Sequence, residues 1–179
     1  SYTAPNNVET ISDGAFSGSS LQSITLPDSV HTIGNYVFQG CRSLTSVTLP
    51  NNLQSIGYFA FADCRSLTSL TLPDPVESIG ISTFDGCTSL SSLTLSSSLK
   101  TISNRALYNC PELTSLTVPA SVTSIGNEVF AFCSKLESIT FLSSTPPTVG
   151  STIFHRVAPS AIVYVHPSAT GFGATFEGL

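Results

Sequence analysis

Five cysteines carry the most reactive side chains of this chain, because a thiolate binds metals, forms disulfides and acts as a nucleophile. They recur every 23 residues, at Cys41, Cys64, Cys87, Cys110 and Cys133. Zinc sites and redox dithiols use closely spaced pairs such as C-x-x-C, which this sequence lacks. The repeat spacing instead places the five side chains at one equivalent position, as a buried file about 4.8 Å apart. We therefore predict free thiols that pack as small hydrophobic side chains, with disulfides between neighbours in the file as the alternative.

Histidine and carboxylate side chains are the other candidates for catalysis or metal binding. His31 lies in an expected turn, whereas His155 and His166 flank the last expected strand, and no G-x-S-x-G turn accompanies them. Asp28 and Asp74 lie on expected turns of an exposed rim, where carboxylates keep a protein soluble rather than form an acid and base pair. A calcium loop would need a dense run of Asp, Asn and Gly. We expect no enzyme activity, no cofactor and no metal site.

The composition excludes several classes of partner. Only 9% of the residues are charged, the formal net charge is −5, and six Lys and Arg residues are too few for a grip on nucleic acid or on an anionic membrane. No apolar run approaches the roughly 18 residues that a membrane helix needs, so we expect no transmembrane segment in this chain. Hydrophobic residues make up 41% of it, and 31 Ser and 21 Thr residues supply most of the polar surface.

A 23-residue repeat accounts for this composition. Leucine recurs at positions 21, 44, 67, 90, 113 and 136. Residues 44–49 alternate apolar and hydroxyl side chains, as a half-buried strand does, and Pro50 ends that strand. After Ile56, the apolar residues Ala60 and Cys64 follow at i+4 and i+8, which indicates one or two turns of α-helix or 3₁₀-helix. One strand and one short return per unit predict an α/β solenoid whose coils stack to share one core.

The repeated unit reads L-x-S-[IVL]-T-[LVF]-P-x-x-[VL]-x-[ST]-I-G-x-x-x-F-x-x-C-x-x over about residues 1–142. It resembles the BspA-like, or Treponema-type, class of leucine-rich repeats. The resemblance implies a curved parallel β-sheet on the concave side, with the short helical turns expected above on the convex side. It also implies kinship with secreted or cell-surface proteins of bacteria and some protists, several of which are regarded as adhesins for matrix proteins or other cells.

The two ends of the repeat differ. Residues 1–5 match 23–27, so the first strand is truncated at Ser1, and either further repeats or a partner would cover that end. Residues 1–142 are expected to form the solenoid. Residues 143–179 are expected to form an irregular last repeat and a C-terminal cap, with a last strand at 161–165.

Two surfaces are candidate binding sites. The first consists of the outward Ser and Thr files of the strands, Ser23, Thr25, Ser46, Thr48, Ser69, Thr71, Ser92, Thr94, Ser115, Thr117, Ser138 and Thr140. These residues would form a broad neutral face for carbohydrate or protein, or simply repeat an exposed strand residue with good β propensity. The second is a convex apolar patch of Tyr36, Tyr58, Phe59 and Ile81, with packing inside the coils as its alternative.

Our leading hypothesis is a non-enzymatic extracellular or cell-surface module for adhesion or protein binding. Its partner would be a protein or glycan on a host or neighbouring cell surface. A second hypothesis is a self-stacking structural subunit of a filament or surface layer, associating end to end. A third, more remote one is ice binding by the Ser/Thr ladder, for which the expected curvature is an obstacle.

Overall fold

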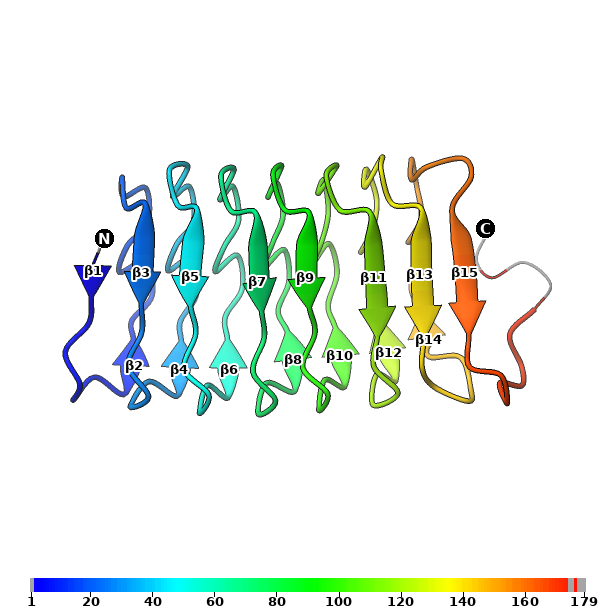
Figure 1. Cartoon of the computed structure of the whole chain (residues 1–179), viewed down its shortest axis with the longest axis horizontal. Coiled ribbons are helices and arrows are strands. Elements are labelled where there is room, and N and C mark those ends of the chain that lie inside the picture. The colour runs from blue at the N-terminus through cyan, green and yellow to red at the C-terminus, as the bar shows by residue number, and fades with distance from the viewer. Residues whose placement is uncertain (1, 174–175, 177–179) are drawn as a thin grey trace.

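The computed structural model describes residues 2–173 and Phe176, and over these residues the chain forms a solenoid of parallel strands (Figure 1). One side of each coil carries a strand of two to four residues. These front strands are β1 (Tyr2–Thr3), β3 (Ser23–Thr25), β5 (Ser46–Thr48), β7 (Ser69–Thr71), β9 (Ser92–Thr94), β11 (Ser115–Val118), β13 (Ser138–Phe141) and β15 (Ile162–Val165).

The opposite side of each coil carries a strand of two residues. These back strands are β2 (Thr10–Ile11), β4 (Thr32–Ile33), β6 (Ser55–Ile56), β8 (Ser78–Ile79), β10 (Thr101–Ile102), β12 (Ser124–Ile125) and β14 (Thr148–Val149). They form one continuous parallel sheet of seven strands in sequence order. Each isoleucine of this sheet pairs with the isoleucine of the next coil, as Ile33 does with Ile56, except that Ile125 pairs with Val149. Residues 23 apart in the sequence therefore lie side by side in neighbouring strands.

The predicted helical turns are absent from the described residues, which corrects that part of the expectation. After each back strand the chain turns, and alternate N–H groups of the turn bond the next coil. The N–H of Phe38 donates to the carbonyl of Ala60 at 2.7 Å, and the N–H of Gly40 donates to that of Ala62 at 2.8 Å. Because these donors bond the next coil, they are not available for the i to i−4 bonds of a helix.

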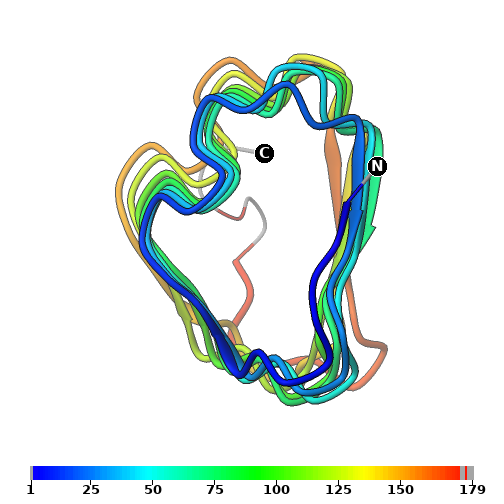
Figure 2. The same cartoon turned by 90° about the vertical axis from the view of Figure 1, so that its left-hand side faces the viewer.

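The coils stack along a nearly straight axis in Figure 1, and they superpose closely in the end-on view of Figure 2. This is less curvature than we expected for the sheet. A repeat protein curves when one side of its coil is wider than the other, and here paired strands on both sides have a step of about 4.8 Å, apart from two wider gaps between front strands. We refer to the twelve Ser and Thr residues of the front strands as the Ser/Thr face.

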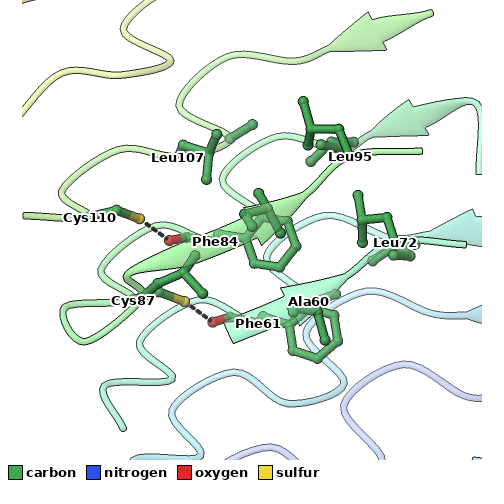
Figure 3. Packing of buried hydrophobic residues seen from close by; sticks show 14 of the residues in the cluster. Ala60, Phe61, Leu72, Phe84, Cys87, Leu95, Leu107 and Cys110 are labelled. Atoms are coloured by element: carbon green, nitrogen blue, oxygen red, sulfur yellow. Dashed lines mark hydrogen bonds between the residues drawn. The ribbon is translucent and has the colours of Figure 1, made fainter. Parts of the chain in front are cut away.

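The core consists of columns in which equivalent side chains of successive coils pack on one another. Phe38, Phe61 and Phe84 are fully buried and stack in sequence, with ring centroids 5.1 Å and 5.5 Å apart. Leu107 takes the same position in the next coil (Figure 3). Such a column exists only between coils, so no coil can bury its apolar edge alone.

The front sheet is not continuous. Its strands divide into three groups, β1-β3-β5, β7-β9 and β11-β13-β15. Figure 1 shows the wider spacing between β5 and β7 and between β9 and β11. Sequence periodicity gave no sign of these two interruptions, because the 23-residue step is maintained across both.

Aromatic side chains cover the core at the C-terminal end of the described chain. Phe172 and Phe176 lie with ring centroids 5.7 Å and 5.2 Å from that of Phe141. The expected last strand is present as β15, in register with β13. The division into a solenoid at 1–142 and a cap at 143–179 stays a prediction, and Ser1 lies outside the described residues.

Candidate binding surfaces

The Ser/Thr face occupies the outer surface of the front strands. Nine of its twelve side chains are exposed, whereas Ser23, Ser138 and Thr140 are half-buried. In-register pairing places Ser46 beside Ser23 and Thr48 beside Thr25, so the hydroxyl groups form two files along the axis. No ionisable side chain belongs to either file.

The files of hydroxyls end at β15. There Ile162 and Tyr164 take the positions of Ser138 and Thr140, and they are 51% and 52% exposed. The sequence showed this replacement, and the structure places both apolar side chains on the same surface as the hydroxyls.

The four residues of the predicted convex patch lie together. Tyr36 and Tyr58 are 42% and 52% exposed, Ile81 is 39% exposed, and Phe59 is half-buried. Tyr36 and Phe59 stack with ring centroids 5.4 Å apart and planes 13° apart. The N–H of Tyr36 donates to the carbonyl of Tyr58, and the N–H of Phe59 donates to that of Ile81. The patch is therefore an exposed surface, and packing within the coils explains only Phe59.

A ladder of side-chain acceptors follows the same column of the repeat elsewhere. Asp13 Oδ1 accepts the N–H of Asn35 at 2.7 Å, and Asn35 Oδ1 accepts the N–H of Tyr58 at 2.9 Å. Later in the chain, Asn104 Oδ1 accepts the N–H of Asn127 at 2.8 Å, and Asn127 Oδ1 accepts the N–H of Ser151 in the next coil. We call these four residues, Asp13, Asn35, Asn104 and Asn127, the amide ladder. Each holds one coil to the next.

The patch interrupts this ladder. Tyr58 and Ile81 occupy the two columns between Asn35 and Asn104, and neither side chain can accept a hydrogen bond in this way. Two interior links of the ladder are thus replaced by exposed apolar side chains. A net hydrogen bond is worth about 0.5–1.5 kcal/mol, so the exchange is unfavourable for stability.

A glycine follows five of the seven back strands, and there is a physical reason for it. A Cβ at Gly57 would lie 2.6 Å from Asn35 Oδ1, and one at Gly126 would lie 2.4 Å from Asn104 Oδ1. The ladder side chain of one coil covers the glycine of the next. Ser103 replaces the glycine in the coil that follows Ile81, where no ladder side chain needs the space. Gly34, Gly57, Gly126 and Gly150 each follow a ladder residue by one coil, a signal that sequence comparison between repeats could have used, whereas Gly80 follows Tyr58.

Backbone conformation does not distinguish the patch from the other coils. Tyr36 and Phe59 have φ angles of 59° and 55°, in the left-handed region, where the first coil has Gly14 at 66°. An L-residue in this region costs about 1–2 kcal/mol relative to the right-handed one. Ser82, Arg105, Glu128 and Thr152 adopt the same conformation at this position, so the cost is shared by the coils and is not specific to the patch.

The cysteines form the predicted buried file. All five are fully buried and free. Cys87 Sγ donates to the carbonyl of Phe61 at 3.1 Å, and Cys110 Sγ donates to that of Phe84 at 3.2 Å (Figure 3). Burial raises the pKa of the Cys64 and Cys87 thiols far above the usual range, so these sulfurs stay protonated. Their role is packing and donation to the preceding coil.

The remaining titratable groups among the described residues form no cluster that could hold a metal ion. Four ion pairs are present among the described residues, for example Arg105 to Glu128 at 2.6 Å, and all lie on the surface. His155 and His166 are exposed, and His31 is half-buried. Within residues 2–173 and Phe176, no group of three or more His, Cys, Asp or Glu side chains is placed to hold a metal ion. The same residues contain no helix that is long and apolar enough to cross a membrane.

Comparison with known proteins identifies the repeat. The model of the BspA type leucine rich repeat region matches residues 1–72 and 54–174, and six copies are found. The chain belongs to the BspA-type leucine-rich repeat family. A search of curated protein sequences finds no match.

Solved structures of this repeat type are similar to the chain. The leucine-rich repeat protein of T. pallidum is 30% identical with a TM-score of 0.82, over 88% of this chain and 77% of that one. A leucine-rich cell surface protein of Faecalibacterium prausnitzii is 31% identical with a TM-score of 0.60, over 81% of this chain and 48% of the other. The chain therefore spans about half of that relative. The pneumococcal vaccine antigen PcpA, 24% identical with a TM-score of 0.62 over 92% of this chain and 49% of its own, shares the fold.

Proposed function

We propose that this BspA-type chain is a non-enzymatic, extracellular or cell-surface module that binds a protein partner and acts in adhesion. One observation carries the proposal: the convex patch exposes Tyr58 and Ile81 where the repeat otherwise has a stabilising amide ladder. Departures from the local rules of a fold are expected at functional or strained sites.

The composition of the patch suits a protein contact. Tyrosine is enriched among the residues that dominate binding energy, because it combines a large apolar surface with few rotatable bonds. The rings of Tyr36 and Phe59 are held by stacking and by fixed backbone, so little conformational entropy would be lost on binding. The relative from Faecalibacterium is described as a cell surface protein, which supports the proposed location.

A repeat-restoring variant tests the proposal. Tyr58→Asn fits because the next coil has Gly80, and Ile81→Ser introduces the residue that Ser151 shows in the same column. We expect the double variant to lose at least about tenfold in affinity for matrix proteins or whole cells in a surface-binding assay. We also expect Tyr58→Asn to raise the free energy of unfolding by about 0.5–1.5 kcal/mol in urea, because it completes one ladder hydrogen bond.

The matched control is Tyr164→Thr, which removes a tyrosine of equal exposure and also restores the repeat residue. This variant should bind as the wild type does. Equal binding by the patch variant and the wild type would refute the assignment of the patch. A wild-type protein that binds no matrix protein and no cell at saturating concentration would refute the adhesive function itself.

A self-stacking subunit is the second candidate. Support comes from β15, a four-residue strand with exposed Ile162 and Tyr164 that pairs, among the described strands, with β13 alone. Sedimentation across a concentration series tests it, because a protein that stays monomeric at every concentration excludes stacking. Ice binding is not proposed, since the two interruptions of the front sheet break the regular step that a match to the ice lattice would require.

A further inference from the structure

The two interruptions of the front sheet coincide with two grooves on the Ser/Thr face. One groove, of about 380 Å³, lies between β5 and β7, and the other, of about 360 Å³, lies between β9 and β11. We call them the first and the second seam groove. Both volumes fall in the lower part of the range of small-molecule sites.

Each groove contains backbone groups that the sheet leaves without partners. Where the ladder is continuous, Leu26 N–H donates to the carbonyl of Thr48 at 3.1 Å, and Leu72 N–H donates to that of Thr94 at 2.9 Å. The corresponding bond from Leu49 to the next strand is missing in the first seam groove, although the structure describes every residue of both strands.

The second seam groove repeats this arrangement. Leu95 N–H makes no bond to the carbonyl of Thr117 across the described strands β9 and β11. Each groove thus presents a free N–H donor on one strand and a free C=O acceptor on the next. Unsatisfied backbone groups at a surface are strong hydrogen-bonding sites for a ligand or for water.

The lining of both grooves is neutral and amphipathic. Hydroxyl groups such as those of Thr48 and Thr71 form the rim of the first, and Val47, Leu49 and Leu70 form its floor. Val47 is half-buried, whereas the equivalent Ile24 and Leu93 are buried, and Leu93 borders the second seam groove, so only the first groove opens the core to the surface. No ionisable side chain lines either groove.

We propose that the two seam grooves bind a neutral glycan chain. Vicinal sugar hydroxyls act as donor and acceptor at once, which matches the free C=O and N–H of each groove, and the C–H faces of a pyranose match the apolar floor. The uncharged lining provides no partner for an acidic glycan, which would lose hydration without compensation.

A peptide strand fits less well. An inserted strand would separate its neighbours to about 9.6 Å, twice the normal spacing. The flanking strands still have Cα atoms within 8 Å of one another, so a ligand must lie over the seam and reach single backbone groups from above. This inference concerns the Ser/Thr face and is independent of the patch proposed for protein binding.

The experiment measures stoichiometry and position. The whole chain is titrated with neutral hexasaccharides of glucose, mannose and N-acetylglucosamine, with a hyaluronan hexasaccharide as the acidic comparison. We expect two sites for at least one neutral probe, and at least about tenfold weaker binding of the acidic one. The amide NMR signals of Leu49 and Leu95 should move on binding.

Paired variants assign each site. Thr48→Val/Thr71→Val should remove the first site and Thr94→Val/Thr117→Val the second, leaving one site in each case. The matched control, Thr25→Val/Thr140→Val, changes the same file on strands whose neighbours are paired on both sides, and it should keep two sites. No binding of any neutral probe, unchanged stoichiometry in both groove variants, or shifts confined to other residues would overturn the proposal.

Discussion

At single positions of this protein, an exposed apolar side chain replaces a residue that would stabilise the fold. Tyr58 and Ile81 stand where neighbouring coils have the ladder acceptors Asn35 and Asn104. Each replacement is unfavourable for the isolated fold, and both fall within one patch. A residue that departs from the repeat and lowers the stability of the fold indicates function more strongly than an exposed residue that follows the repeat.

The cysteine file gives a prediction at this scale. We expect iodoacetamide to leave all five thiols unmodified in the native protein at about pH 8, because burial raises the pKa of Cys64 and Cys87 and excludes the reagent. Mass spectrometry after labelling measures this, with the urea-unfolded protein as the control that should take up five labels. Rapid native labelling of any cysteine would contradict the packing role.

Asp85 gives a pH-dependent prediction. Desolvation by burial raises the pKa of its carboxyl group above the ordinary value of 3.8. Below 3.8 both states are protonated and the group has no effect. As pH rises through the folded pKa, the unfolded state ionises more readily and stability is lost. We expect Asp85→Asn to be as stable as the wild type at about pH 3 and more stable at about pH 7, by urea unfolding. An equal difference at both pH values would contradict this cause.

At the scale of elements, one boundary between coils is weaker than the rest. It separates the coil of β5 and β6 from that of β7 and β8, and we call it the central boundary. Gly57 N–H donates to Ile33 at 2.9 Å and Gly126 N–H to Ile102 at 2.8 Å, yet no such bond from Gly80 crosses this described boundary. Tyr58 lies over Gly80 at the same place. The patch, the first seam groove and the missing bonds therefore meet at one boundary.

Hydrogen exchange tests this weakness. The amides of Leu49 and Gly80 should exchange at least about tenfold faster than those of Leu72 and Gly57, which occupy the same positions one coil away with bonded N–H groups. Two-dimensional NMR resolves these four amides. Equal protection within each pair would show that the boundary is closed in solution.

The whole molecule is a stack in which each coil contacts only its neighbours, so its cooperativity depends on every boundary. A weak central boundary divides it into two blocks, one before and one after it. The sequence step is the same across this boundary as across the others, and the division arises only from lost hydrogen bonds.

Core variants on either side test the division. Phe38→Ala should lower the stability of the first block by about 3–5 kcal/mol, because Phe38 is fully buried. Its unfolding in urea should then separate into two transitions, followed by circular dichroism. Phe130 is equally buried but lies beyond the central boundary, so in Phe130→Ala the second block should unfold at lower urea concentration than the first. A single transition in both variants would show that the blocks are fully coupled.

The sequence by itself determined the repeat, its register and its core, because a 23-residue period leaves one stacking arrangement in which Leu, Ile, Phe and Cys columns align. It also identified the Ser/Thr face and the patch, since these depend on which positions face outward. The absence of helical turns required the structure, because apolar spacing cannot show that N–H groups bond the next coil. The seams, the amide ladder and its interruption at Tyr58 also required it. These features depend on contacts between residues about 23 apart, which no local pattern encodes.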